Sequence, residues 1–203
     1  MKRTFFSLAL LLAVATLTPQ TKMTAREAAV KIADRILAST TYEFKNTKTG
    51  EIYKSVKKLP LDMDVKVACK YNNWHYTNGV TNMALMELGD KLGDKKYEKY
   101  VLKNMNFVFN EGNLDFFRKQ YDEAFKRDGW NAVRKLSWHM IFRGKRLDDN
   151  GPMGASLIEL QLKYPNDSFL GYINETAEHL NYGEPRLVDG TIARIWPHVN
   201  TIW

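Results

Sequence analysis

Two adjacent aspartates, Asp148 and Asp149, are the residues of this chain best suited to acid–base chemistry. They stand in the segment RLDDNGPMGASLIEL, residues 146–160, directly ahead of a turn and an apolar run. The Asn-Gly pair that follows suits a helix N-cap, and Pro152 suits the first helical position, where its missing N–H costs nothing. We therefore predict a helix that begins at Pro152, with the two carboxylates at its N-terminal end.

These carboxylates have two interpretations. An aspartate ahead of a helix most often caps it or interacts with its dipole. If one is instead catalytic, its neighbour is not, since successive side chains of an extended segment face opposite ways. Behind them, Met153, Leu157 and Leu160 recur at helical spacing, which predicts that one face of the helix packs in the core.

Aromatic and imidazole side chains supply candidate substrate contacts. Trp74 and Tyr76 precede a predicted helix, where their rings could stack on a sugar or pack in the core. Trp196 and, two residues later, His198 are further candidates for substrate contact, and for His198 a structural role is the alternative. His139, about ten residues ahead of the aspartates, suits a core or a cleft.

Other catalytic chemistries lack their motifs. The sequence contains no G-x-S-x-G, no P-loop and no G-x-G-x-x-G. Its four histidines show no H-E-x-x-H spacing, and Cys69 is the only cysteine, so we expect no metal, no cofactor and no intrachain disulfide. What remains is carboxylate chemistry with aromatic and basic contacts, typical of carbohydrate-active enzymes.

The first 20 residues have the pattern of a secretory signal peptide. Lys2 and Arg3 precede an apolar run too short to span a bilayer, which predicts a secreted or periplasmic protein with no membrane span after cleavage. Removing these two cations lowers the formal charge from +7 to +5. An exported basic protein without nucleic-acid motifs favours an acidic oligosaccharide as partner, although a solvated basic face is the alternative.

Helical periodicity dominates the elements that must position these residues. We predict helices after the Thr24/Glu27 capping box, from Thr77 or Asn78 to Gly89 or Gly93, from Asp94, and in four further segments (114–125, 130–136, 152–163 and 167–183). Residues 39–72 read as a long surface loop with at most a short strand, and Asp189-Gly190 as a hairpin turn. Short connections favour antiparallel hairpins, so the predicted fold is all-α with one small β-hairpin.

Three segments resemble glycoside hydrolase family 105, the unsaturated rhamnogalacturonyl hydrolases, and more distantly the family 88 unsaturated glucuronyl hydrolases. They are WHYTNGVTNMALMELGDKLGDKKY, RLDDNGPMGASLIEL and DGTIARIWPHVNTIW. The central segment is the most specific, because the family pattern resembles L-D-D-x-G-x-M-G-A; Asn150 stands where a cysteine is frequent.

The resemblance implies an (α/α)6 toroid that removes a 4,5-unsaturated uronic acid from the non-reducing end of pectin or rhamnogalacturonan fragments. An aspartate protonates C4 of the double bond while water is delivered to C5, and the resulting hemiketal rearranges. Carried onto this sequence, that acid falls on Asp149, with Asp148 left open, and substrate contacts fall on His198, Trp74 and Tyr76.

Residues 21–203 then form the N-terminal part of such a domain, because family members continue beyond Trp203 with several more helices. The sequence supplies about half of a six-hairpin ring, which suggests either a truncated product or a chain that pairs with a partner. Two alternatives to the hydrolase follow: an inactive remnant or glycan-binding module, and a helical scaffold for a protein partner.

Overall fold

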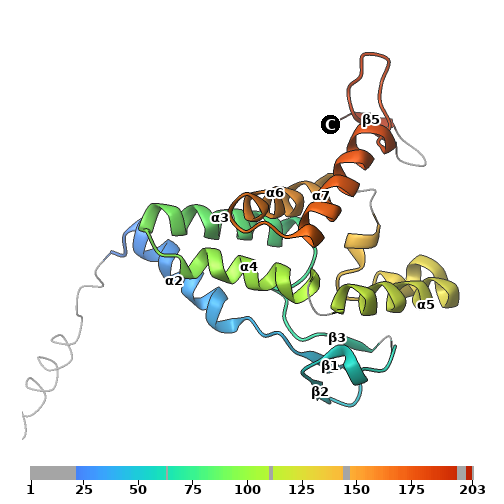
Figure 1. The fold of residues 1–203 in the computed structure, drawn as a ribbon, viewed down its shortest axis with the longest axis horizontal. Coiled ribbons are helices and arrows are strands. Elements are labelled where there is room, and N and C mark those ends of the chain that lie inside the picture. The colour runs from blue at the N-terminus through green and yellow to red at the C-terminus, as the bar shows by residue number, and fades with distance from the viewer. Residues whose placement is uncertain (1–21, 63, 110–111, 144–146, 196–199, 203) are drawn as a thin grey trace, which may run out of the picture. The chain divides into compact units, whose positions relative to one another are not determined.

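A computed structural model of the 203-residue chain describes residues 22–62, 64–109, 112–143, 147–195 and 200–202. The chain divides into two units, Met1–Ile32 and Ala33–Trp203. The elements are α2 (Ala25–Ser39), β1 (Phe44–Asn46), β2 (Ile52–Tyr53), β3 (Val65–Val67), α3 (Tyr76–Leu92), α4 (Lys96–Phe109), α5 (Asn113–Val133), α6 (Leu147–Lys163), α7 (Asp167–Glu178), β4 (Ala193–Ile195) and β5 (Asn200–Ile202), with short helical turns η1 (Val56–Lys58), η2 (His139–Phe142) and η3 (His179–Gly183) (Figure 1). This mostly helical architecture with short antiparallel strands confirms the predicted fold class.

The predicted capping box starts α2, in the first unit. Glu27 Oε2 accepts a hydrogen bond from the Thr24 backbone N–H at 2.8 Å, and Thr24 Oγ1 accepts one from the Glu27 N–H at 3.2 Å. Each side chain thus satisfies a backbone donor that the first helical turn leaves without a partner.

The ends of α3 lie close to the predicted positions. The helix begins at Tyr76, one residue before the predicted start, and its N-cap is His75, whose Nδ1 accepts from the Thr77 backbone N–H at 3.3 Å. The helix ends at Gly93, whose φ of 67° is left-handed and suits glycine. Asp94 Oδ1 then accepts from the Lys96 backbone N–H at 3.0 Å and opens α4, as predicted.

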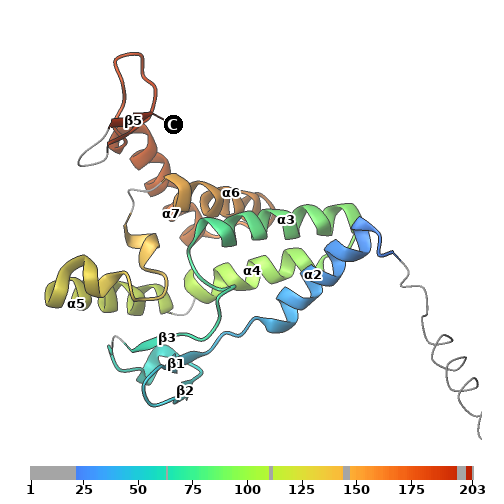
Figure 2. The same cartoon turned by 180° about the vertical axis from the view of Figure 1, so that it is seen from behind.

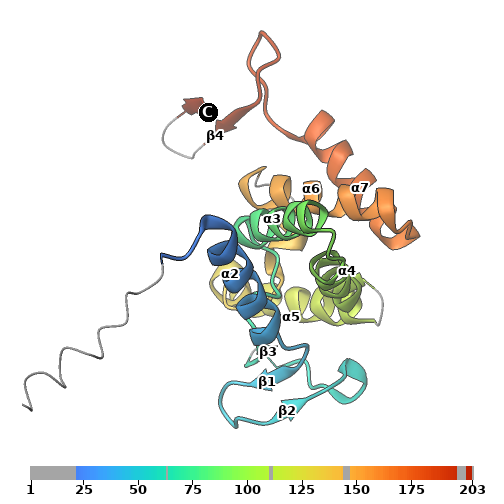
Figure 3. The same ribbon diagram turned by 90° about the vertical axis from the view of Figure 1, so that its left-hand side faces the viewer.

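The second unit is built around a parallel pair of helices, α3 and α6. Gly79 near the start of α3 lies directly against Pro152 near the start of α6, and Lys163 at the end of α6 pairs with Asp90 at the end of α3. Figure 3 shows α3 next to both α4 and α6, and Figure 2 shows the same pair from behind. The two helices therefore begin at the same end of the pair.

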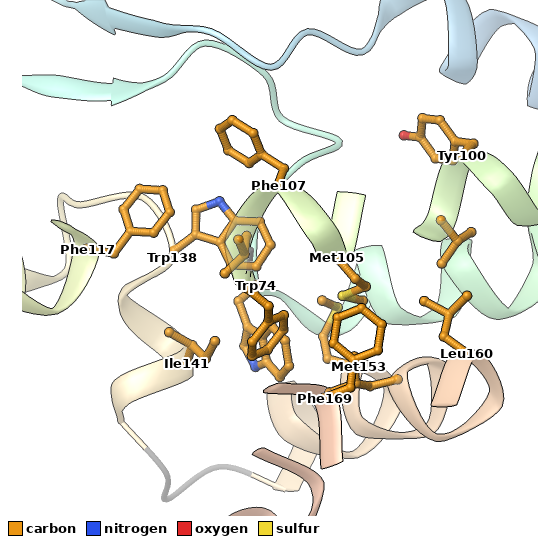
Figure 4. Close-up of a cluster of buried hydrophobic side chains, with 14 of the residues drawn as sticks. Trp74, Tyr100, Met105, Phe107, Phe117, Trp138, Ile141, Met153, Leu160 and Phe169 are labelled. Carbon is orange, nitrogen blue, oxygen red and sulfur yellow. The ribbon is translucent and has the colours of Figure 1, made fainter. Parts of the chain in front are cut away.

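The apolar face predicted for α6 packs in the core. Met153, Leu157 and Leu160 are at most 1% exposed. They join a cluster that includes Trp74, Trp138 and Phe169, and Figure 4 shows several of these side chains together. This burial confirms the helical spacing inferred for the segment.

The predicted start of α6 is wrong. The helix begins at Leu147, so that Pro152 lies inside it and Asp148 and Asp149 are in its first turn. Proline lacks the N–H that would bond to the Asp148 carbonyl, a loss usually costly inside a helix. Here the early turn is anchored by Asn150, only 5% exposed, which is bonded to Trp74. This tertiary contact outweighs the preference of proline for the first position.

Residues 39–72 contain more structure than the predicted surface loop. Three short antiparallel strands form a sheet in the order β2-β1-β3, with Phe44 opposite both Tyr53 and Val67. Phe44 is 1% exposed and packs against the rings of Phe107, Phe116 and Phe117. Strands of two or three residues are too short to show alternation in the sequence, and packing on the helices stabilises them.

The later helical breaks match the sequence more closely. The two helices predicted around residues 114–136 meet at a kink in α5, where Gly129 has φ 51° and ψ −138°. The Asp189-Gly190 turn is also confirmed, because the Leu187 backbone N–H donates to the Thr191 carbonyl at 2.8 Å and Gly190 has φ 85°.

Candidate active site

A buried hydrogen bond joins the aromatic segment to the aspartate motif. The indole Nε1–H of Trp74 donates to Asn150 Oδ1 at 3.0 Å, and Trp74 is 0% exposed. Asn150 is the residue directly after the two aspartates. The two segments singled out in the sequence therefore meet, although through the core and not across an open cleft.

Trp74 is accordingly a core residue, the alternative left open by its sequence. Its ring lies 4.9 Å from that of Tyr172 and 6.1 Å from that of Trp138. The expectation that Trp74 contacts substrate is wrong in this structure, because the loop before α3 turns the indole inward to reach Asn150. Its contribution to any site is to position the first turn of α6.

The aspartates themselves lie on the first turn of α6. Asp148 is exposed, and the side chain of Asp149 is outside the described part of the structure. The expectation that only one of them faces a given side assumed an extended segment. On a helix, successive residues are separated by roughly 100°, so the opposite directions of an extended segment do not apply here. A first-turn carboxylate also interacts favourably with the helix dipole, which is the structural alternative.

Tyr76 is the exposed aromatic residue at the start of α3. It is 46% exposed, and its ring centroid lies 4.6 Å from that of His75. Since α3 and α6 begin at the same end of the helix pair, Tyr76 and Asp148 mark that end. A flat ring and a carboxylate at one end of a helix pair are compatible with the sugar contact predicted from the sequence.

His139 lies in a separate aromatic environment. Its Nδ1 is 2.7 Å from the Leu136 carbonyl oxygen, so this nitrogen carries the proton and donates. Its ring centroid is 5.6 Å from that of Trp130, on which the Arg143 guanidinium is stacked at 4.1 Å. His139 is half-buried. The remaining predicted contacts, Trp196 and His198, lie outside the described residues.

Sequence reasoning missed Asn73, which organises the loop before α3. Its Oδ1 accepts from the backbone N–H groups of Trp74 and Trp138, both at 2.9 Å. Trp138 has φ 61°, a left-handed conformation uncommon for a tryptophan. The Asn-Asn-Trp run of residues 72–74 was the available signal, because asparagine side chains commonly bond to backbone groups in turns.

The described residues hold no cluster of three or more His, Cys, Asp or Glu side chains that could bind a metal. Within the same residues, every helix is too short or too polar to cross a bilayer. Comparison of the chain with models of known protein families and with curated proteins found no match. Evidence for a function therefore comes from the site residues and from the sequence resemblance.

Proposed function

We propose that the chain is an unsaturated uronyl hydrolase of the family 105 type. The observation that carries the proposal is the Asp-Asp pair in the first turn of α6, in the segment that resembles the family most specifically. Two further features support it: the Trp74–Asn150 hydrogen bond fixes this turn, and an exposed tyrosine stands at the same end of the neighbouring helix. Secretion to the periplasm or beyond is part of the proposal.

In the proposed mechanism, one aspartic acid transfers its proton to C4 of the unsaturated uronate. Water adds at C5, and the same carboxylate accepts the water proton, so that the carboxyl group is regenerated. The hemiketal formed at C5 opens and releases the remaining saccharide. Asp149 is the proposed acid, with Asp148 as the alternative, and the Tyr76 ring is the proposed contact with the sugar.

Turnover of unsaturated digalacturonate tests the proposal. The reaction is followed as loss of the absorbance of the conjugated C4=C5 uronate, with Asp148→Asn and Asp149→Asn beside the wild type. Loss of the proton donor should lower kcat by about 10²- to 10⁴-fold. Asp167→Asn is the matched control, since Asp167 is also an acidic residue in a first turn, that of α7, and it should retain full activity.

Two results would contradict the assignment. Full activity in both aspartate variants removes the proposed acid. Absence of turnover in the wild type, together with calorimetric binding of the disaccharide that Tyr76→Ala weakens, identifies a glycan-binding module instead. That second function is favoured by the exposure of the Tyr76 ring.

A further inference from the structure

Two lysines face each other on the outer side of the small sheet. Lys45 of β1 is directly opposite Lys66 of β3. Their neighbours Phe44, Asn46 and Val65 are buried. Because successive side chains of a strand point to opposite faces of the sheet, the two lysines lie on the face away from the core. Like charges placed directly opposite are destabilising. Within the described residues, neither lysine has an anionic partner within 4.0 Å.

An acid near this pair already has a partner. Asp64 stands directly before β3, close enough for the charge of Lys66 to act on it, and its Oδ2 pairs with Lys48 Nζ at 2.5 Å. The hydrogen bond from Lys48 lowers the pKa of Asp64, and the nearby charges of Lys66 and Arg127 lower it further. Asp64 thus lies near three cations, and Asp62, whose charge also acts on Lys48, is a second acid there. With Lys45 included, four cations face these two carboxylates, which leaves an excess of positive charge.

A hollow on α5 continues the basic surface. It has a volume of about 460 Å³ and is lined by Leu61, Glu123, Lys126 and Arg127. Glu123 pairs with Lys126 at 2.9 Å, whereas Arg127 has no ion pair within 4.0 Å in the described part of the chain. The hollow is open to solvent, so the Arg127 guanidinium, which matches the geometry of a carboxylate, is accessible to a ligand.

The backbone beneath these charges is held firmly. Gln120 of α5, only 1% exposed, donates its Nε2–H groups to the carbonyls of Asp62 at 2.6 Å and Val65 at 3.0 Å. Phe44 anchors β1 in the aromatic core, and Figures 1 and 2 show β3 beside α5. The sheet and the hollow therefore keep a fixed spacing, which lowers the entropic cost of binding a ligand.

We propose that this basic face, defined by Lys45, Lys66 and Arg127, binds a segment of an acidic polysaccharide through successive uronate carboxylates. Ile52, which is opposite Lys45 and 47% exposed, supplies an aliphatic contact for a sugar ring. In its described part, the outer side of the sheet carries no aromatic ring on which a nucleic-acid base could stack. The choice of a uronate polymer as the ligand rests on the proposed function. The excess of positive charge on this face is independent of that function.

Binding of polygalacturonate to the full chain, measured by calorimetry, tests this inference. Lys45→Gln/Lys66→Gln should weaken the affinity roughly tenfold, as expected for the loss of two exposed ion pairs, and Arg127→Gln should weaken it severalfold. Lys95→Gln/Lys99→Gln is the matched control: Lys95 lies directly before α4 and Lys99 lies on it, both are exposed, and the net charge changes equally. The affinity of this variant should equal that of the wild type. Thermal unfolding of each variant verifies the fold.

Neutral and non-carbohydrate polymers complete the test. Fully methyl-esterified galacturonan, which has the same backbone without the charge, should not bind. The inference is overturned if the Lys45/Lys66 variant binds as the wild type does, if the control variant loses as much affinity, or if duplex DNA binds as tightly as polygalacturonate. None of these measurements requires turnover. If the chain binds polygalacturonate through these residues but hydrolyses nothing, the proposed hydrolase is refuted and this inference stands.

Discussion

The closest approach of α3 and α6 gives the sharpest prediction from this structure. A Cβ added at Gly79 would lie 2.4 Å from the Pro152 carbonyl carbon, 2.5 Å from the Met153 backbone nitrogen and 2.7 Å from Pro152 Cβ. The optimal separation of non-bonded carbon atoms is about 3.5–4.0 Å. Relief thus requires the helices to separate by about 1 Å, since the obstructing atoms are mainly backbone.

Gly79→Ala should therefore destabilise the protein. Forcing an extra methyl group into a well-packed interface typically costs about 1–3 kcal/mol, and the backbone clash puts this site at the upper end. For a chain of this length, about 2–3 kcal/mol corresponds to a Tm lowered by roughly 4–12 °C. Urea unfolding followed by tryptophan fluorescence and by circular dichroism measures the change.

Gly154→Ala is the matched control on the facing helix. No atom lies within 4 Å of the Cβ that it would add, and alanine is favoured over glycine inside a helix by roughly 0.5–1 kcal/mol. This variant should be slightly more stable than the wild type. A Gly79→Ala protein as stable as the wild type would refute the packing of α3 on α6 described here.

Two further substitutions probe the polar contacts of the core. Glu98 accepts hydrogen bonds from Lys163 Nζ at 2.6 Å and Tyr164 Oη at 2.5 Å, which lower the pKa of its carboxyl group below the usual 4.5. The stability that these bonds provide is complete above the unfolded-state pKa of Glu98 and is lost as the pH falls through its folded-state pKa. Glu98→Gln should therefore cost about 1–2 kcal/mol at neutral pH and flatten the decline of Tm below about pH 4.5. Equal acid sensitivity of Tm in the variant and the wild type would contradict this. Trp74→Phe leaves the buried Asn150 oxygen without its donor and should cost about 1–3 kcal/mol in urea unfolding, whereas an unchanged midpoint would show that the bond does not anchor α6.

The sequence by itself determined the helices, because each signal for them is local. The Thr24/Glu27 box, a glycine at the end of α3 and the spacing of Met153, Leu157 and Leu160 depend only on neighbouring residues and on the 3.6-residue period. The structure has a helical element at each of these places. The pairing of Trp74 and Tyr76 with the aspartate motif as parts of one site came from the resemblance and from chemistry, and the catalytic roles remain predictions.

Tertiary structure alone decided the contacts between segments distant in the chain. Asn150 begins the helix early because a tryptophan 76 residues away donates to it, and this contact also turned Trp74 into a core residue. The three-residue strands exist because Phe44 is buried against α4 and α5, and their register is what sets Lys45 opposite Lys66. Such effects follow from burial and from hydrogen bonds between distant residues, which no local pattern contains.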